Sequence, residues 1–237
     1  MRDKLRTKDH WDNIFRHSNH NIERSNKLLA RMVSEKGEDF DGLKRVYMGL
    51  RLTYMNRLNA LYSSGGDIDE INALFPSILE TFKKSWTNES GYLNIVWLVS
   101  IGIMIDAPIE MMQELEQLVT DNDYNDYLLN FLFRSIDLSW EKHHETFIAP
   151  IPYKFLSSVI EAETKEESSR LLKEYLDNVW YNGHDDEFWY DSHKDKKSFY
   201  DGYWSYESGA IAKILNLDDT GWNDMNYYPY DMVHYRA

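Results

Sequence analysis

The sequence predicts an all-α protein: two packed helical domains, built of helical hairpins in a short solenoid-like arrangement, with a loop-rich aromatic cap at the C-terminus. Three observations support this fold class. Apolar residues recur at three- and four-residue spacing along most of the 237-residue chain. Capping residues, prolines and glycines separate these stretches. Alternation of apolar and polar residues, the pattern of a strand, is scarce, so we expect no substantial sheet.

The first expected helix is long and amphipathic. Its apolar residues recur over 43–62, and the helix-breaking sequence at 63–66 ends it. Asp67 then precedes Glu70 by three residues, which is a capping pattern at the start of a helix. This pattern predicts a second helix that continues to about residue 86.

A largely apolar stretch follows, from Tyr92 to Ile105. It contains Asn94 and Ser100, and it is shorter than the roughly 20 residues that span a bilayer. We therefore expect a buried core helix here and no membrane-spanning segment. Pro108 suits a first helical turn and predicts the start of the next helix.

Four more helices are expected in the second half of the chain. Pro152 suits the first turn of one of them. Thr164 and Glu167 form a capping box at the start of another. The four helices are expected over 124–136, 152–160, 164–180 and 202–215.

The two halves of the chain differ in charge. Residues 1–120 contain 15 Lys and Arg against 17 Asp and Glu, whereas residues 121–237 contain 11 against 23. The sequence Asp121-Asn122-Asp123 also interrupts the helical pattern at this point. We therefore expect a boundary near residue 121, between an N-terminal helical domain (1–121) and an acidic, aromatic-rich C-terminal helical domain (122–237).

The net charge of −14 argues against direct binding to nucleic acid or to an anionic membrane, because both attract basic surfaces. It favours a basic protein partner, although solubility alone is an alternative explanation for the acidity. The chain has no Cys, and residues 1–8 lack the apolar run of a secretory signal. We expect a cytoplasmic protein, and the sequence leaves its oligomeric state open.

The most distinctive motif lies near the C-terminus. The sequence Gly-Tyr-Trp-Ser-Tyr-Glu at 202–207 opens a helix of small residues, and Glu207 falls on the apolar face of that helix. A buried carboxylate needs a hydrogen-bonding partner, so we expect a structural role for Glu207. An acidic turn and the sequence Tyr-Pro-Tyr-Asp follow. The motif residues are Gly202, Tyr203, Trp204, Glu207, Tyr228, Pro229, Tyr230 and Asp231.

In these residues the chain resembles the C-terminal domain of the PoNe-immunity (PoNi) family. Members of this family are all-helical proteins that neutralise a partner DNase toxin used in competition between bacteria. The resemblance implies a cognate DNase toxin as the partner and a binding role in place of an enzymatic one. It implies no catalytic residue and no cofactor, and the motif identifies the family without locating the toxin contact.

The toxin contact is expected in the acidic and aromatic stretch that follows Trp180. A DNase must be basic where it holds phosphates, so carboxylates can occupy its cleft. Tyr and Trp are frequent anchors of protein interfaces. The candidate contacts are Asp185, Asp186, Glu187 and Asp191, with Trp189 or Tyr190 as the anchor. A second acidic surface is offered by Glu161, Glu163, Glu166 and Glu167.

Two other functions stay open. The sequence His184-Asp185-Asp186-Glu187 contains metal-ligand types and would suit a metal-dependent hydrolase. It lies in an expected loop without helical His spacing, so we expect no metal. No phosphate-binding loop, nucleophile elbow or Rossmann fingerprint is present. The other alternative is a helical adaptor that has no toxin partner.

Overall fold

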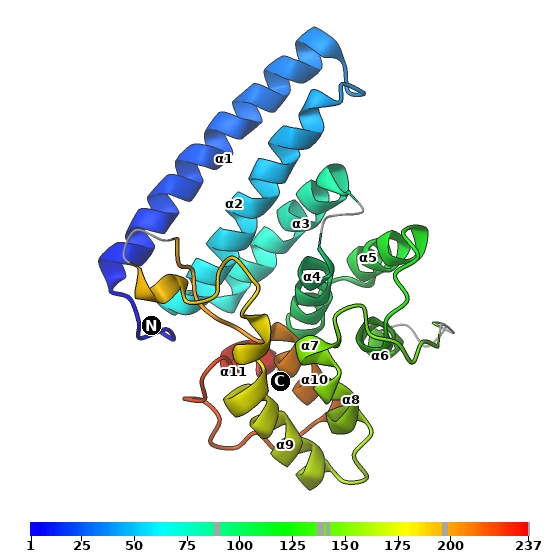
Figure 1. Ribbon diagram of the computed structural model, residues 1–237. Helices are drawn as coiled ribbons and strands as arrows, with labels where there is room; N and C mark the ends of the chain where they lie inside the picture. The colour runs from blue at the N-terminus through cyan, green and yellow to red at the C-terminus, as the bar shows by residue number, and fades with distance from the viewer. Residues whose placement is uncertain (88–90, 137–139, 141–142, 196–198, 237) are drawn as a thin grey trace. The chain divides into compact units, whose positions relative to one another are not determined.

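The computed structural model describes residues 1–87, 91–136, 140, 143–195 and 199–236. Every regular element among these residues is a helix, which confirms the predicted all-α class (Figure 1). The chain forms two compact units. We call Met1–Ser90 with Phe199–Tyr203 the N-terminal unit, and Gly91–Ser198 with Trp204–Ala237 the C-terminal unit. Within the described residues, no helix combines the length and the apolar character needed to cross a membrane.

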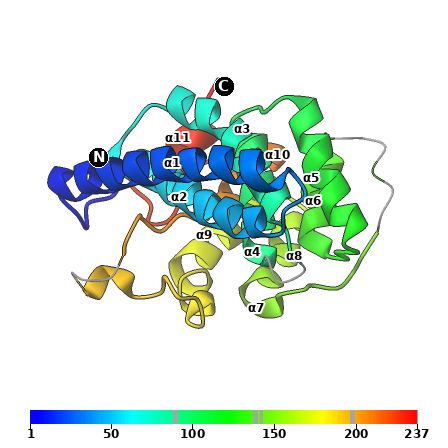
Figure 2. The same ribbon diagram turned by 90° about the horizontal axis from the view of Figure 1, so that it is seen from above.

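The helices of the N-terminal unit are α1 (Lys8–Lys36), α2 (Gly42–Ser64) and α3 (Ile68–Ser85). The first two lie side by side as a long hairpin in both views (Figures 1 and 2), and α2 also packs against α3. Leu29, Leu43 and Leu50 form a buried cluster that joins α1 to α2. Burial of such apolar side chains is the main force that holds a helical hairpin together.

The segment Phe199–Tyr203 belongs to this unit although it comes from late in the chain. Tyr200 is buried, and its hydroxyl donates to the carboxylate of Asp3. The backbone carbonyl of Asp201 accepts a hydrogen bond from Ser63 Oγ at 2.7 Å. The N-terminal unit therefore depends for part of its packing on residues that follow most of the C-terminal unit in sequence.

The C-terminal unit contains more and shorter helices. Its α-helices are α4 (Tyr92–Met104), α5 (Ile109–Asp121), α6 (Tyr127–Ile136), α7 (Pro150–Tyr153), α8 (Phe155–Ile160), α9 (Lys165–Glu174), α10 (Tyr206–Leu215) and α11 (Tyr230–Val233). A π-helix, η1 (Tyr175–Val179), continues α9, and two 3₁₀ turns follow, η2 (Asn182–His184) and η3 (Ser192–Lys194).

Helices α4 and α10 pack against each other, and α6 and α11 each contact both of them. Gly209 makes this close packing possible. A Cβ atom at this position would lie 2.5 Å from Met104 Sδ and 2.6 Å from Pro229 Cγ, which is closer than van der Waals contact allows. The small residue therefore lets α10 approach the end of α4 and the segment that leads into α11.

Aromatic side chains fill the irregular part of the C-terminal unit. Trp180 is fully buried, and its ring stacks on that of Trp189 with the ring centroids 5.6 Å apart. The ring centroids of Trp180 and Tyr227 are 4.8 Å apart. Tyr227 in turn stacks on Tyr181, with the two rings 3° from parallel. This packing is the aromatic cap that the sequence predicts.

The structure differs from the sequence-based predictions at two helices. The sequence predicts no helix over the residues that form α1. The helix predicted over 202–215 begins only at Tyr206, because Gly202 has a positive φ of 113° and the backbone N–H of Ser205 donates to Tyr227 O at 2.8 Å. The predicted N-cap of α9 is present, since Thr164 Oγ1 accepts from the N–H of Glu167 at 3.2 Å. The domain boundary near residue 121 stays a prediction, whereas the compact units divide after residue 90.

Candidate functional site

Glu207, the carboxylate of the C-terminal motif, lies completely buried in the first turn of α10. Its Oε1 accepts hydrogen bonds from Ser205 Oγ at 2.8 Å and from the hydroxyl of Tyr175 at 3.2 Å. The Ser205 hydroxyl also lies 2.6 Å from Ser208 Oγ. These hydrogen bonds join the start of α10 to the π-helix that follows α9.

Burial raises the pKa of Glu207 from its ordinary value of 4.5 to about 7, because desolvation disfavours the charged form. The hydrogen bonds from Ser205 and Tyr175 act in the opposite direction and favour the carboxylate. The indole N–H of Trp180 also lowers this pKa, although neither it nor Glu207 Oε2 has a hydrogen bond of normal geometry within the described part of the chain. The largest effects that oppose the burial are therefore hydrogen bonds.

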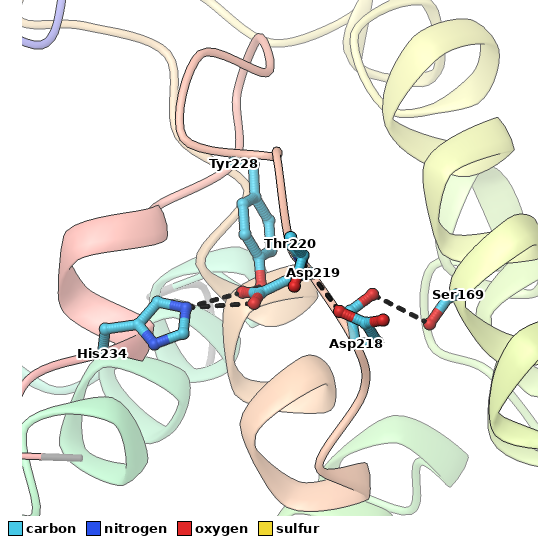
Figure 3. Close-up of polar contacts among 6 residues, drawn as sticks. All are labelled: Ser169, Asp218, Asp219, Thr220, Tyr228 and His234. Carbon is cyan, nitrogen blue, oxygen red and sulfur yellow. Dashed lines mark hydrogen bonds and ion pairs between the residues drawn. The ribbon is translucent and has the colours of Figure 1, made fainter.

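The acidic turn after α10 is also structural in part (Figure 3). Asp219 is buried and accepts a hydrogen bond from the hydroxyl of Tyr228 at 2.7 Å, and both of its oxygens lie 3.0 Å from His234 Nε2. Asp218 is exposed, and its carboxylate accepts from the N–H of Thr220 at 3.0 Å. The turn therefore connects α10 to the Tyr-Pro-Tyr-Asp sequence that the motif includes.

The remaining motif residues are placed by the same packing. Tyr203 is buried in the N-terminal unit, and Trp204 is buried in the C-terminal unit. Tyr230 is half-buried in α11, with its ring centroid 4.3 Å from that of His234. Asp231 is exposed in the first turn of α11. The structure thus places most of the motif inside the fold.

The loop expected to contact the toxin begins at a buried residue. His184 Nδ1 lies 2.7 Å from the carbonyl oxygen of Trp180, and His184 Nε2 lies 3.0 Å from the hydroxyl of Tyr153. Burial lowers the pKa of His184, which favours the neutral ring. A neutral imidazole has one donor and one acceptor nitrogen, and both are engaged here.

The far end of this loop is also held by the fold. Trp189 is only 9% exposed and packs between Trp180 and Trp97, so its ring is part of the core. Asp191 accepts a hydrogen bond from the Tyr181 hydroxyl at 2.9 Å and forms an ion pair with Lys194 at 2.7 Å. The side chains of Trp189 and Asp191 are therefore both engaged in contacts within the fold.

Between these ends, three of the four residues at 185–188 are exposed. Asp185 and Asp186 are exposed and Glu187 is half-buried, and burial followed by the charge of Asp186 raises the pKa of Glu187. Phe188 is 85% exposed. Phe188 is not among the contacts that the sequence predicts, because aromatic residues occur throughout this stretch and no sequence pattern distinguishes the exposed ring from the buried one. Tyr190 is half-buried, with its ring 4.7 Å from that of Tyr181.

The second acidic surface lies at the turn between α8 and α9. Glu163, Glu166 and Glu167 are exposed there, and Glu161 accepts a hydrogen bond from the Tyr127 hydroxyl at 2.8 Å. The start of α9 also contacts the turn after α10, since Ser169 Oγ donates to the carbonyl oxygen of Asp218 at 3.4 Å (Figure 3). This surface and the 185–188 loop are different segments of the sequence, and both contain exposed carboxylates.

The metal-dependent alternative receives no geometric support. Across the described ranges, no group of three or more His, Asp or Glu side chains is arranged to hold a metal ion. The single His of the candidate cluster, His184, uses both ring nitrogens within the fold.

Comparison with known families identifies the chain. The model of the PoNe immunity protein (PoNi) N-terminal domain matches residues 2–117, and the model of the PoNi C-terminal domain matches residues 124–232. Together these two matches cover nearly the whole chain. The chain belongs to the PoNe immunity protein family.

Comparison with solved structures supports the fold. The crystal structure of protein PA2201 from Pseudomonas aeruginosa is similar with a TM-score of 0.72 and 16% sequence identity. The match covers 99% of this chain and 89% of that one. At this identity the likeness extends to the fold alone. A comparison with curated proteins gave no match.

Proposed function

We propose that this PoNe immunity protein binds a cognate DNase toxin and neutralises it by masking the basic cleft that holds DNA. Family membership carries the immunity role. The charge distribution supports the masking mode, because most of the net charge of −14 comes from residues 121–237. Neutralisation is expected in the cytoplasm, where the toxin would meet DNA.

The proposed attraction between the two proteins is electrostatic. A DNase binds phosphates with basic residues, because the DNA backbone is uniformly negative. Exposed carboxylates held at fixed positions provide an alternative set of negative charges for the same cleft. Opposite charges also speed association, which matters for an inhibitor that must reach the toxin before the toxin reaches DNA.

The 185–188 loop is the surface that we favour for this contact. Its carboxylates at Asp185 and Asp186 are exposed, whereas Glu207 and Asp219 are buried and engaged in hydrogen bonds. The buried side chains of His184 and Trp189 fix the two ends of the loop. A loop that is already ordered loses less conformational entropy on binding than a mobile one.

A charge-reversal experiment tests the loop. Replacing Asp185, Asp186 and Glu187 together by Lys should slow association with the toxin by at least about tenfold, since electrostatic steering contributes factors of this size. The matched control replaces Glu163, Glu166 and Glu167 by Lys in the second acidic surface. Unchanged inhibition by the first variant would reject this loop as the contact, and loss of inhibition in the control would point to the second acidic surface.

A competition experiment tests the masking mode. Duplex DNA and the immunity protein should compete for the toxin, so increasing DNA should raise the apparent Kd of the protein complex. A ternary complex of toxin, DNA and immunity protein would contradict masking and would favour inhibition by distortion. The proposed role involves no chemistry by this chain, so incubation with it should leave the toxin and the DNA covalently unchanged.

A further inference from the structure

The two most exposed of the large apolar side chains in the described residues lie on neighbouring elements of the C-terminal unit. Phe188 is 85% exposed and Ile151 is 76% exposed. Ile151 belongs to α7, and Phe188 follows η2 by four residues. Helix α7 and turn η2 pack against each other.

The packing of α7 on η2 is close and specific. A Cβ atom at Gly183 would lie 2.6 Å from Pro152 Cβ, so only glycine permits this approach. One residue further along each element, the hydroxyl of Tyr153 lies 3.0 Å from His184 Nε2. The backbone positions next to Ile151 and before Phe188 are therefore fixed by buried contacts.

Acidic side chains precede Phe188 in the loop that follows η2. Asp185 and Asp186 are exposed in the three residues before Phe188, and Glu187 is half-buried beside it. Apolar residues at the centre of a polar rim are the usual anatomy of a protein interface. The charge of the rim requires a partner surface that is basic around an apolar pocket.

We propose that Phe188 and Ile151 form the apolar anchor of the toxin interface, and that they enter an apolar pocket bordered by Lys or Arg side chains on the toxin. This inference rests on the proposed function and assigns different kinetic roles within the same surface. Asp185 and Asp186 raise the association rate, whereas Phe188 and Ile151 lower the dissociation rate of the complex. Buried aromatic anchors commonly carry much of the binding energy of an interface.

Association and dissociation rates of the purified full-length chain with its catalytically inactivated toxin test this division. Phe188→Ala should raise koff by about 30-fold, the effect of a hot-spot residue, and leave kon nearly unchanged. Ile151→Ala should raise koff in the same direction. Asp185→Asn with Asp186→Asn should instead lower kon and weaken its dependence on ionic strength. Phe199→Ala is the matched control, because Phe199 is 53% exposed in the N-terminal unit.

The outcomes separate this inference from the proposed function. An unchanged koff in both Phe188→Ala and Ile151→Ala, with tight binding of the wild-type chain, overturns the anchor and leaves the immunity role intact. Absence of any complex between the wild-type chain and the toxin overturns both. Concentration-dependent dimers of the chain alone that Phe188→Ala abolishes would show that a second copy covers the pair, which also overturns the anchor. Circular dichroism spectra equal to wild type exclude misfolding as the cause.

Discussion

The C-terminal motif and the 185–188 loop both combine aromatic with acidic residues, yet these residues are placed in opposite ways. In the motif, Glu207 is fully buried and Gly209 allows helices to meet closely. In the loop, Asp185 and Asp186 face the solvent, and Phe188 is 85% exposed. Residues of the same types thus build the core in one region and offer a surface in the other.

This difference explains why the motif identifies the family, whereas we propose the toxin contact in the loop. Buried carboxylates and close packing constrain the residue types strictly, so the motif is distinctive enough to identify the family. An exposed loop has no such constraint from the fold. Its residues are free to match one particular partner, which is what discrimination between toxins requires.

The largest expected effect contrasts a buried aromatic residue with an exposed one. Trp180→Ala should lower the free energy of unfolding by about 3–5 kcal/mol, because it leaves a cavity in the aromatic cap. Phe188→Ala, the matched exposed change, should alter it by less than about 0.5 kcal/mol. Denaturant titration monitored by circular dichroism measures both. Similar losses in the two variants would contradict the assigned difference in burial.

A smaller effect is expected at the buried carboxylate. Glu207→Ala should lower the free energy of unfolding by about 1–3 kcal/mol, because it removes the carboxylate that accepts from the hydroxyls of Ser205 and Tyr175. Glu207→Gln should be milder, since the amide oxygen can still accept. Glu163→Ala on the surface is the control. Equal melting curves for the wild type and Glu207→Ala would contradict this role.

The raised pKa of Glu207 predicts a pH dependence of the same core. Its pKa is about 7 in the folded state against an ordinary value of 4.5, so between these values the folded state binds more protons than the unfolded state. The contribution of Glu207 to stability is therefore fully present below about pH 4.5 and is lost as the pH rises to about 7. Asp201, whose pKa burial raises from 3.8 to about 7, acts in the same direction.

Thermal unfolding of variants across this pH range separates the two groups. Glu207→Gln and Asp201→Asn should each reduce the loss of stability that accompanies rising pH, and the double variant should reduce it further. If Glu207→Gln follows the wild-type curve at every pH, the ionisation of Glu207 is not coupled to folding.

The smallest expected effect on stability belongs to the loop carboxylates. Asp185→Asn with Asp186→Asn should change the free energy of unfolding by no more than about 0.5 kcal/mol, because neither side chain is buried. Thermal melts at several salt concentrations measure this change. A loss comparable to that of Glu207→Ala would show that the loop carboxylates support the fold and would remove the contrast between the two regions.

Local patterns predicted most helices, because spacing and caps act over a few residues. The N-cap at Thr164 and the apolar stretch of α4 are examples. Helix α1 was missed, and its buried residues, such as Trp11 and Leu29, are few and widely spaced among polar ones. The start of α10 was placed too early because the bond from Ser205 N–H to Tyr227 O joins residues far apart in sequence.

The candidate site was predicted less completely for the same reason. The sequence located the acidic loop, but the exposure of each aromatic ring depends on tertiary packing. Trp189 packs on Trp97, which is about ninety positions earlier in the sequence. The exposure of Phe188 follows from that arrangement, and no pattern within the loop indicates it.

Hydrogen–deuterium exchange of the full chain, free and bound to its inactivated toxin, tests the central claim most directly. The account predicts that toxin binding slows exchange most strongly in peptides that cover 185–191 and the neighbouring α7. Unchanged exchange in these peptides, together with protection at 161–167, would place the contact on the other acidic surface and contradict the account.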